Sequence, residues 1–133
     1  AMLLCQTAII EKDTGNVSLI NTFSGFILRE IPGPANPFTV FIQLVGGTGR
    51  YEIEARLHDL RRDQIIGMAS GMQIEFKDRL RRINVMIPVP PVPLPHDGAY
   101  DLVVLANGQI VEKQTFTAKI YRPSPPQEEP EDA

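Results

Sequence analysis

At 133 residues, 43% of them hydrophobic and 22% charged, the chain suits one soluble domain with a packed core and leaves little room for two. The formal net charge of −3 is misleading, because Glu128, Glu129, Glu131 and Asp132 lie at the C-terminal end and without them 12 acidic residues face 13 basic ones. A nearly neutral domain gives no electrostatic reason to expect nucleic acid or an anionic membrane as a partner.

Cys5 is the single cysteine, so the chain forms no internal disulfide, which is typical of a reducing compartment. The four residues before it, Ala1 to Leu4, are too few for the leader of a lipoprotein, and we expect it to be buried. No run approaches the roughly 18 apolar residues of a membrane span. We therefore expect a cytoplasmic protein.

The first third of the chain predicts a β-hairpin and then a separate strand. Residues 3–10 and 17–23 are rich in apolar and β-branched residues, and a Gly/Asn/Asp cluster at 12–16 separates them. Three prolines within residues 32–37 exclude a helix or a central strand there. Residues 38–45 then alternate with a period of two, which predicts a strand.

Residues 51–58 show the cleanest alternation, but they also contain strong helix formers. Tyr51, Ile53, Ala55 and Leu57 all fit a strand, whereas Ile53, Leu57 and Leu60 would line one face of a helix. The count of matches favours the strand.

Further short strands are expected at residues 65–68, 72–77 and 83–87. Residues 88–95 begin and end with proline and predict an extended connector between two strands. The same segment has the spacing that aromatic-lined peptide-recognition grooves bind, so a role as a recognition element stays open.

The C-terminal part carries the strongest local signals. A strand from Tyr100 to Leu105 precedes Asn107-Gly108, a dipeptide typical of a tight hairpin turn, and residues 109–120 return as its partner. We place the domain at residues 1–122 and expect the Pro- and Glu-rich residues 123–133 to be a disordered acidic tail.

About seven to nine short strands with no helix predict an all-β fold, an antiparallel two-sheet β-sandwich of the immunoglobulin-like kind. Tyr100 stands where such sandwiches carry a tyrosine corner, with its ring in the core and its hydroxyl bonded to upstream backbone. The cysteine pair and the tryptophan of antibody domains are missing, so a true immunoglobulin domain is excluded.

The chain resembles a family of uncharacterised bacterial proteins of about this length, a domain-of-unknown-function family with a compact β-sandwich. The likeness spans about residues 3–121 and consists of spacing and turn chemistry. It implies no catalytic residue. The matching parts are Leu4-Cys5, residues 10–16 (Ile-Glu-Lys-Asp-Thr-Gly-Asn), residues 17–23, the proline-rich loop before Phe38, and residues 94–100 (Leu-Pro-His-Asp-Gly-Ala-Tyr) leading into Asn107-Gly108.

No residue pattern predicts catalysis, a cofactor or a metal site. The glycine-rich residues 46–50 lack the lysine and the following helix of a phosphate-binding loop. His58 and His96 are the only histidines, and we expect both to face solvent rather than to bind a metal. Glu52 and Glu54 share a strand face, as a glycosidase pair might, but same-face solvated carboxylates are commoner.

Two basic stretches, residues 61–62 and 77–82, raise the question of nucleic-acid binding. Phe76 is the only aromatic residue near them that could stack on bases, and Asp59, Asp63 and Asp78 dilute the positive charge. We therefore expect no nucleic-acid partner.

One pattern does indicate a protein partner. In the strand from Tyr100, the side chains of Val103 and Leu105 point away from the core, and Phe41 and Val45 do the same in theirs. If the two strands are neighbours, these four residues form an apolar outer patch, and such patches mark protein contacts. The other interpretation, that a loop or the tail covers them, stays open.

We therefore expect a non-catalytic protein-binding or assembly module, self-associating through the outer face around Val103 and Leu105. The alternative is a small-ligand-binding protein or an enzyme. Its site would lie in the loops at one end of the sandwich, near residues 46–50 and 96–98.

Overall fold

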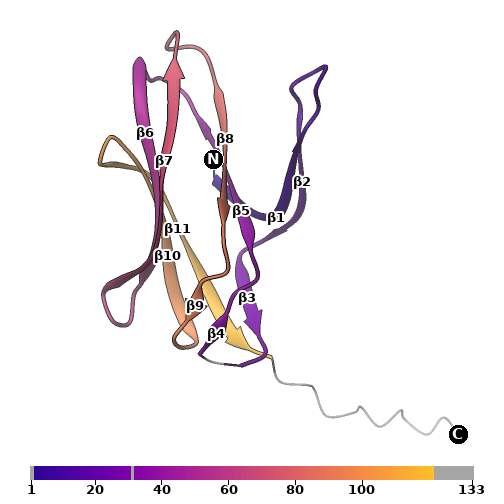
Figure 1. Cartoon of the computed structure of the whole chain (residues 1–133), viewed down its shortest axis with the longest axis vertical. Coiled ribbons are helices and arrows are strands. Elements are labelled where there is room, and N and C mark those ends of the chain that lie inside the picture. Colours follow the sequence, from indigo (N-terminus) through magenta and orange to yellow (C-terminus); the bar gives the residue numbers. More distant parts are fainter. Residues whose placement is uncertain (1, 31, 122–133) are drawn as a thin grey trace, which may run out of the picture.

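Two β-sheets packed face to face form the protein in the computed structural model, which describes residues 2–30 and 32–121 (Figure 1). The first sheet has the strand order β2-β1-β5-β8. Its strands are β1 (Met2–Ile10), β2 (Val17–Phe23), β5 (Phe38–Leu44) and β8 (Ile83–Val89). The expected all-β sandwich is confirmed.

The second sheet has five strands, in the order β3-β11-β10-β6-β7. They are β3 (Gly25–Leu28), β6 (Gly49–Asp59), β7 (Gln64–Phe76), β10 (Gly98–Ala106) and β11 (Gln109–Ile120). A two-residue ribbon, β4 (Gly33–Pro34) with β9 (Pro93–Leu94), closes one end.

The core lies between the two sheets and follows the two-residue alternation of the strands. In β10 the buried inward residues are Tyr100, Leu102 and Val104, and β6 opposes them with Asp59, Leu57 and Ala55. Residues 51–58 therefore belong to a strand and not to a helix, as the count of period-two matches favoured. Cys5 is buried as expected.

The structure departs from the sequence prediction in strand number and in one pairing. The described residues form eleven strands, because β3, β4 and β9 are too short to show a pattern. Residues 65–68 and 72–77 belong to one continuous strand, β7, in which Gly71 adopts a φ of 92°. β3 pairs with β11 in parallel, so the sandwich is not purely antiparallel.

Two local predictions at the C-terminal hairpin are confirmed. Asn107 and Gly108 have φ values of 48° and 80°, as a type I′ turn requires. The hydroxyl of Tyr100 donates a hydrogen bond to the carbonyl oxygen of His96 at 2.6 Å, which is the contact expected of a tyrosine corner.

Residues 90–97 carry the chain from β8 in the first sheet to β10 in the second, whereas Pro88 and Val89, expected in the connector, belong to β8 and pair with β5. The backbone N–H of Ala35 donates to the carbonyl oxygen of Val92 at 3.0 Å and ties the connector to the other proline-rich segment. Among the described residues, no helix is long and apolar enough to cross a membrane. The predicted tail, residues 123–133, lies outside the described residues.

Candidate functional site

A β-hairpin projects from the sandwich, and it is the most unusual feature of the molecule (Figure 1). In the described part of the chain, the pairing of β1 with β5 covers Met2 to Cys5 only, whereas the pairing of β1 with β2 continues to Ile10 and Val17. Residues 6–21, which we name the arm, therefore form a two-stranded ribbon that leaves the first sheet.

The start of β5 explains why the arm leaves the sheet. Residue 37 is a proline, which has no backbone N–H to give to a neighbouring strand, and β5 begins only at Phe38. Beyond Cys5, β1 consequently has a partner on one side alone. The root of the arm is fixed by the side chain of Asn21, whose Nδ2 donates to Oε1 of Gln6 at 2.6 Å.

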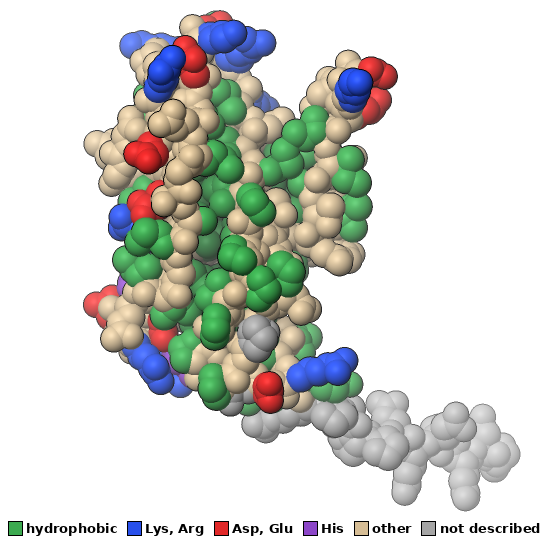
Figure 2. All heavy atoms as spheres, in the orientation of Figure 1, with side chains coloured by type: hydrophobic (Ala, Val, Ile, Leu, Met, Phe, Trp, Pro, Cys, Tyr) green, Lys and Arg blue, Asp and Glu red, His purple; other side chains and the backbone are tan. Residues whose placement is uncertain are grey.

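The arm carries apolar side chains on both of its faces. On the face that continues the interior of the sandwich, Ala8 lies opposite Leu19 and Ile10 opposite Val17. On the other face lie Ile9 and Ile20, with 49% and 43% of their surface exposed. Figure 2 shows hydrophobic side chains along the visible face of the arm, with charged groups gathered at its tip.

The turn at the tip is well ordered by hydrogen bonds. The N–H of Gly15 donates to the carbonyl oxygen of Glu11 at 2.9 Å, and the N–H of Glu11 donates to that of Asn16 at 2.8 Å. Gly15 has a φ of 71°, a conformation that favours glycine. The arm is therefore a defined hairpin, although none of residues 7–20 belongs to the cluster of buried hydrophobic residues that forms the core between the two sheets.

The free edge of β2 within the arm, at residues 17–20, lacks the devices that protect exposed strands, and β2 is irregular only nearer the root, at Asn21, where φ is 53°. Natural edges carry charges, prolines or bulges, or are very short. Among the four edge strands of the two sheets, β8 contains Pro88, β7 contains Glu75 and the kinked Gly71, and β3 has four residues. β2 has seven residues and contains neither a charge nor a proline.

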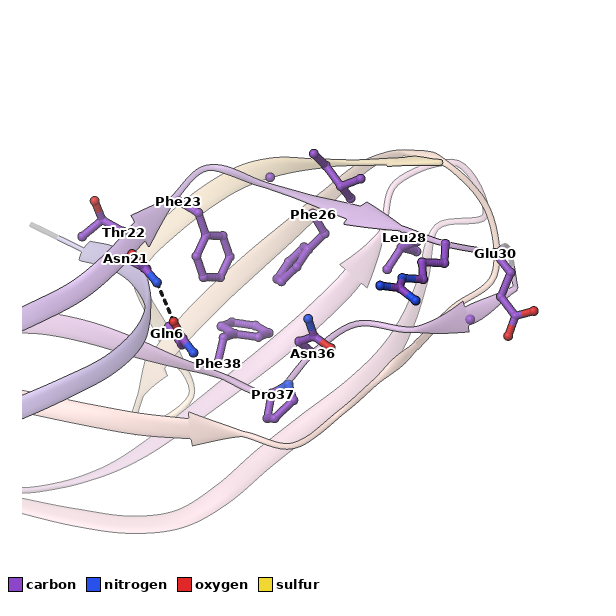
Figure 3. Close-up of a pocket in the computed structure, with 14 residues that line it drawn as sticks. Gln6, Asn21, Thr22, Phe23, Phe26, Leu28, Glu30, Asn36, Pro37 and Phe38 are labelled. Carbon is purple, nitrogen blue, oxygen red and sulfur yellow. Dashed lines mark hydrogen bonds between the residues drawn. The ribbon is translucent and has the colours of Figure 1, made fainter. Parts of the chain in front are cut away.

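A pocket of about 790 Å³ lies at the root of the arm (Figure 3). The rings of Phe23, Phe26 and Phe38 point into it and contact one another, with centroids 4.9–5.7 Å apart. The pair Gln6–Asn21 lies at one end, and Arg29 and Glu30 also line the pocket. An apolar wall with a few polar groups is typical of a binding pocket.

The loop before β10 holds a buried polar cluster made by Asp59, His96 and Tyr100. Nε2 of His96 lies 2.7 Å from Oδ1 of Asp59, and the His96 ring stacks on that of Tyr100. His96 was expected to face solvent, and this prediction is wrong, because only 7% of it is exposed. Its Nδ1 also faces an oxygen, the carbonyl of Asp97 at 2.5 Å, so the cluster holds the loop in place.

The carboxyl of Asp59 has a lowered pKa. Burial opposes this by raising the pKa, but the hydrogen bond with His96, the backbone N–H groups of Arg62 and Arg61 and the charge of His96 outweigh burial. Its other oxygen, Oδ2, is buried and has no hydrogen-bond partner in the described part of the chain. The ionised carboxylate is therefore the form that the fold selects.

The predicted outer patch is not assembled, because its residues lie on two different sheets. Phe41 is in β5 and Val103 and Leu105 are in β10, so the strands are not neighbours and their outer faces point in opposite directions. Phe41 is buried between Leu3 and Met86 of the flanking strands.

Val45, 62% exposed, lies beyond the end of β5. Val103 is half-buried, and Leu105 is 5% exposed, with Glu54 and Ile110 opposite it on the neighbouring strands. Side chains of the same sheet thus leave little of Leu105 for a partner to contact.

The two loops expected to share a site lie at opposite ends of the sandwich. Residues 46–50 stand at the start of β6, while residues 96–98 adjoin its end, since Tyr100 pairs with Asp59. An eleven-residue strand spans about 35 Å, so the loops cannot form one site. The basic stretches 61–62 and 77–82 are separated in the same way by β7.

His58 and Glu54, two of the remaining candidate residues, have local partners. His58 Nε2 lies 3.1 Å from Asp63 Oδ1, and Glu54 pairs with Arg56 at 3.0 Å, on the outer face of β6. Within residues 2–30 and 32–121, no group of three or more His, Cys, Asp or Glu side chains is arranged to hold a metal ion.

Sequence reasoning predicted the first hairpin but missed the arm and the pocket. A usable signal for the arm was present: residues 8–10 and 19–20 are apolar at consecutive positions rather than alternating, so both faces of the hairpin are apolar. Phe23, Phe26 and Phe38 give no such signal, because only the folded chain brings them together.

The fold and the arm define a small all-β sandwich protein with an exposed apolar hairpin. A family of unknown function (DUF6941) matches residues 1–119, and the chain belongs to this family. No curated protein matches the chain in sequence.

Proposed function

We propose that the protein is a non-catalytic protein-binding or assembly module whose contact surface is the arm. The single observation that supports this most is the apolar surface on both faces of a ribbon outside the sandwich. Exposed apolar surface that the monomer leaves uncovered is typical of a protein contact. A two-stranded hairpin alone is marginally stable in water, so a partner that covers the arm would also stabilise it.

The test compares the full chain with an arm-trimmed chain, in which residues 8–19 are replaced by Asn-Gly so that Thr7 and Ile20 flank a two-residue turn. We expect tagged full-length chain to retain its protein partner from a lysate of the host, and the trimmed chain to lose it. The matched control is Leu80→Lys, which removes an exposed leucine from the loop between β7 and β8, outside the arm, and should keep the partner. Equal recovery by the full and trimmed chains would reject the proposal.

A carrier of a small apolar ligand is the second candidate, and the phenylalanine-lined pocket supports it. This pocket lies at the root of the arm and not in the loops at residues 46–50 and 96–98. A bound ligand raises the apparent melting temperature by mass action. A thermal-shift screen with aromatic and aliphatic compounds would support this function if a hit disappears in Phe26→Ala, and would count against it if no compound shifts the melting temperature.

The site of action that we propose is the cytoplasm. This rests on Cys5, the single cysteine, which is buried and whose thiol has a raised pKa because of burial.

A further inference from the structure

Three exposed features of the molecule meet at one place. These are the apolar arm, the unprotected edge of β2, and the phenylalanine-lined pocket at the root of the arm. A partner with a β-strand edge fits all three features, since a second strand can pair the row of free N–H and C=O groups along β2. It must also carry apolar side chains at alternate positions on one face.

β2 itself meets both requirements. Residues 17–20 are extended and uncharged, so two identical strands can approach each other without repulsion. In an antiparallel pair related by a two-fold axis, residues that face each other lie on the same side of the sheet. With Ser18 opposite its own copy, Val17 lies opposite the partner's Leu19, and both belong to the apolar face that continues the sandwich interior.

This register extends the apolar face across four strands. Val17 pairs with Ile10 and Leu19 pairs with Ala8 within one arm. Across the four strands of the combined sheet, Ala8 and Leu19 of one chain therefore lie in line with the partner's Val17 and Ile10. The two-fold axis creates a second, equivalent line from Ile10 and Val17 to the partner's Leu19 and Ala8. Three or more strands with an apolar face are what an independent sheet requires, so the pairing supplies the stability that one arm lacks.

Charge and shape at the ends of the arms are compatible with the same arrangement. The tip of each arm would reach the root of the other, beside the phenylalanine-lined pocket. The tip carries Glu11, Lys12 and Asp13, and the pocket carries Arg29 and Glu30, so opposite charges can meet at both ends. A two-fold arrangement of this kind is closed and self-limiting.

We propose that the partner of the arm is a second copy of this chain, joined through antiparallel β2 edges with Ser18 at the two-fold axis. This proposal rests on the proposed function, because it names the partner that the arm binds.

The first experiment is sedimentation velocity on the full chain and two variants over a range of concentrations. We expect a dimer for the native chain and its loss in Ser18→Lys, which opposes two lysines at the axis. The matched control, Thr7→Lys, adds the same charge to the same face of the arm but on β1, away from the free edge, and should remain a dimer. Mixing Ser18→Lys with Ser18→Glu should restore a dimer, which also shows that both variants fold.

A second experiment tests the register. Cys5 is buried, so a single introduced cysteine reports only its own contact. On oxidation, Ser18→Cys should form a covalent dimer, whereas Ile20→Cys should not, because its neighbour is the partner's Asn16. A mixture of Ile20→Cys and Asn16→Cys should then cross-link.

A chain that stays monomeric at every concentration overturns the proposal, as does a dimer that Ser18→Lys leaves intact or that Ile20→Cys cross-links by itself. The proposed function fails separately, when the arm-trimmed chain keeps every partner of the full chain. A monomer whose arm still captures a different protein rejects only the self-pairing.

Discussion

At the scale of single residues, the cluster of Asp59, His96 and Tyr100 fixes the entry into β10. Burial raises the pKa of the Tyr100 phenol, so the hydroxyl remains protonated and donates to the carbonyl oxygen of His96. Tyr100 also stacks on Phe116, whose ring contacts Phe26 in the pocket wall. The cluster therefore links the loop before β10 to the core.

Tyr100→Phe is expected to lower the free energy of unfolding by about 1–2 kcal/mol, because the buried carbonyl of His96 loses its donor while the ring stays in place. Urea denaturation measures this change. Tyr51→Phe is the control, since the Tyr51 hydroxyl only accepts a 3.3 Å hydrogen bond from an exposed N–H and its loss should be undetectable. Equal effects of the two variants would contradict the structural role of Tyr100.

Asp59 should make stability depend on acid. A carboxyl whose pKa is lowered in the folded state stabilises the fold above its ordinary pKa of 3.8, and this contribution is lost as the pH falls below that value. Asp59→Asn should lower the free energy of unfolding by roughly 3 kcal/mol at neutral pH, because it removes the carboxylate that pairs with His96 and places a buried amide where Oδ2 has no partner. It should also make the free energy of unfolding fall less steeply as the pH is lowered.

Urea midpoints measured from pH 7 down to acid check this expectation. Asp63→Asn serves as the control, because it removes the carboxylate of an exposed His–Asp pair of the same chemical type. A curve for Asp59→Asn that runs parallel to the native one throughout the acid range would show that another group causes the loss.

Residue-scale predictability depended on how local each contact is. The corner of Tyr100 and the turn at Asn107-Gly108 were foreseen, because each is set by residues within a few positions. The pairing of His96 with Asp59 joins residues 37 positions apart, and neither periodicity nor turn chemistry encodes it. The sequence placed His96 in a turn correctly but gave no reason for its burial.

At the scale of elements, the arm shows what strand patterns leave undetermined. The hairpin of β1 and β2 was predicted from its two apolar runs and its turn. Its departure from the sheet depends on Pro37 and on the point where β5 begins, and a pattern within residues 3–23 contains no information about either. The same limit explains the missed strand β3, whose four residues take their partner from β11.

Trimming the arm should leave the sandwich intact. The core cluster contains none of residues 7–20, so replacing residues 8–19 by Asn-Gly removes no core contact. At low protein concentration, where any dimer has dissociated, we expect the free energy of unfolding to stay within about 1 kcal/mol of the native chain, the scale of surface changes. Denaturant titration measures it, and a much larger loss would mean that the arm supports the fold.

At the scale of the whole molecule, the sequence predicted two sheets but not the order of strands within them. Alternation correctly assigned an inner and an outer face to β5 and β10, yet it could not show that they belong to different sheets. The patch of Phe41, Val45, Val103 and Leu105 depended on that adjacency. Apolar surface instead remains exposed on the arm, where β1 no longer pairs with β5. The point at which that pairing stops becomes visible only once the sheet is assembled.

If the arms pair, the stability of the molecule must depend on its concentration. A partner that binds only the folded chain raises the melting temperature by mass action, so the native chain should melt at increasing temperature as concentration rises. Ser18→Lys should melt at one temperature throughout, equal to that of the native chain at its lowest concentration, because its monomer is unchanged. Differential scanning calorimetry over the widest practicable range decides the matter: parallel slopes for the two proteins would place the stabilising contact somewhere other than the edge of β2.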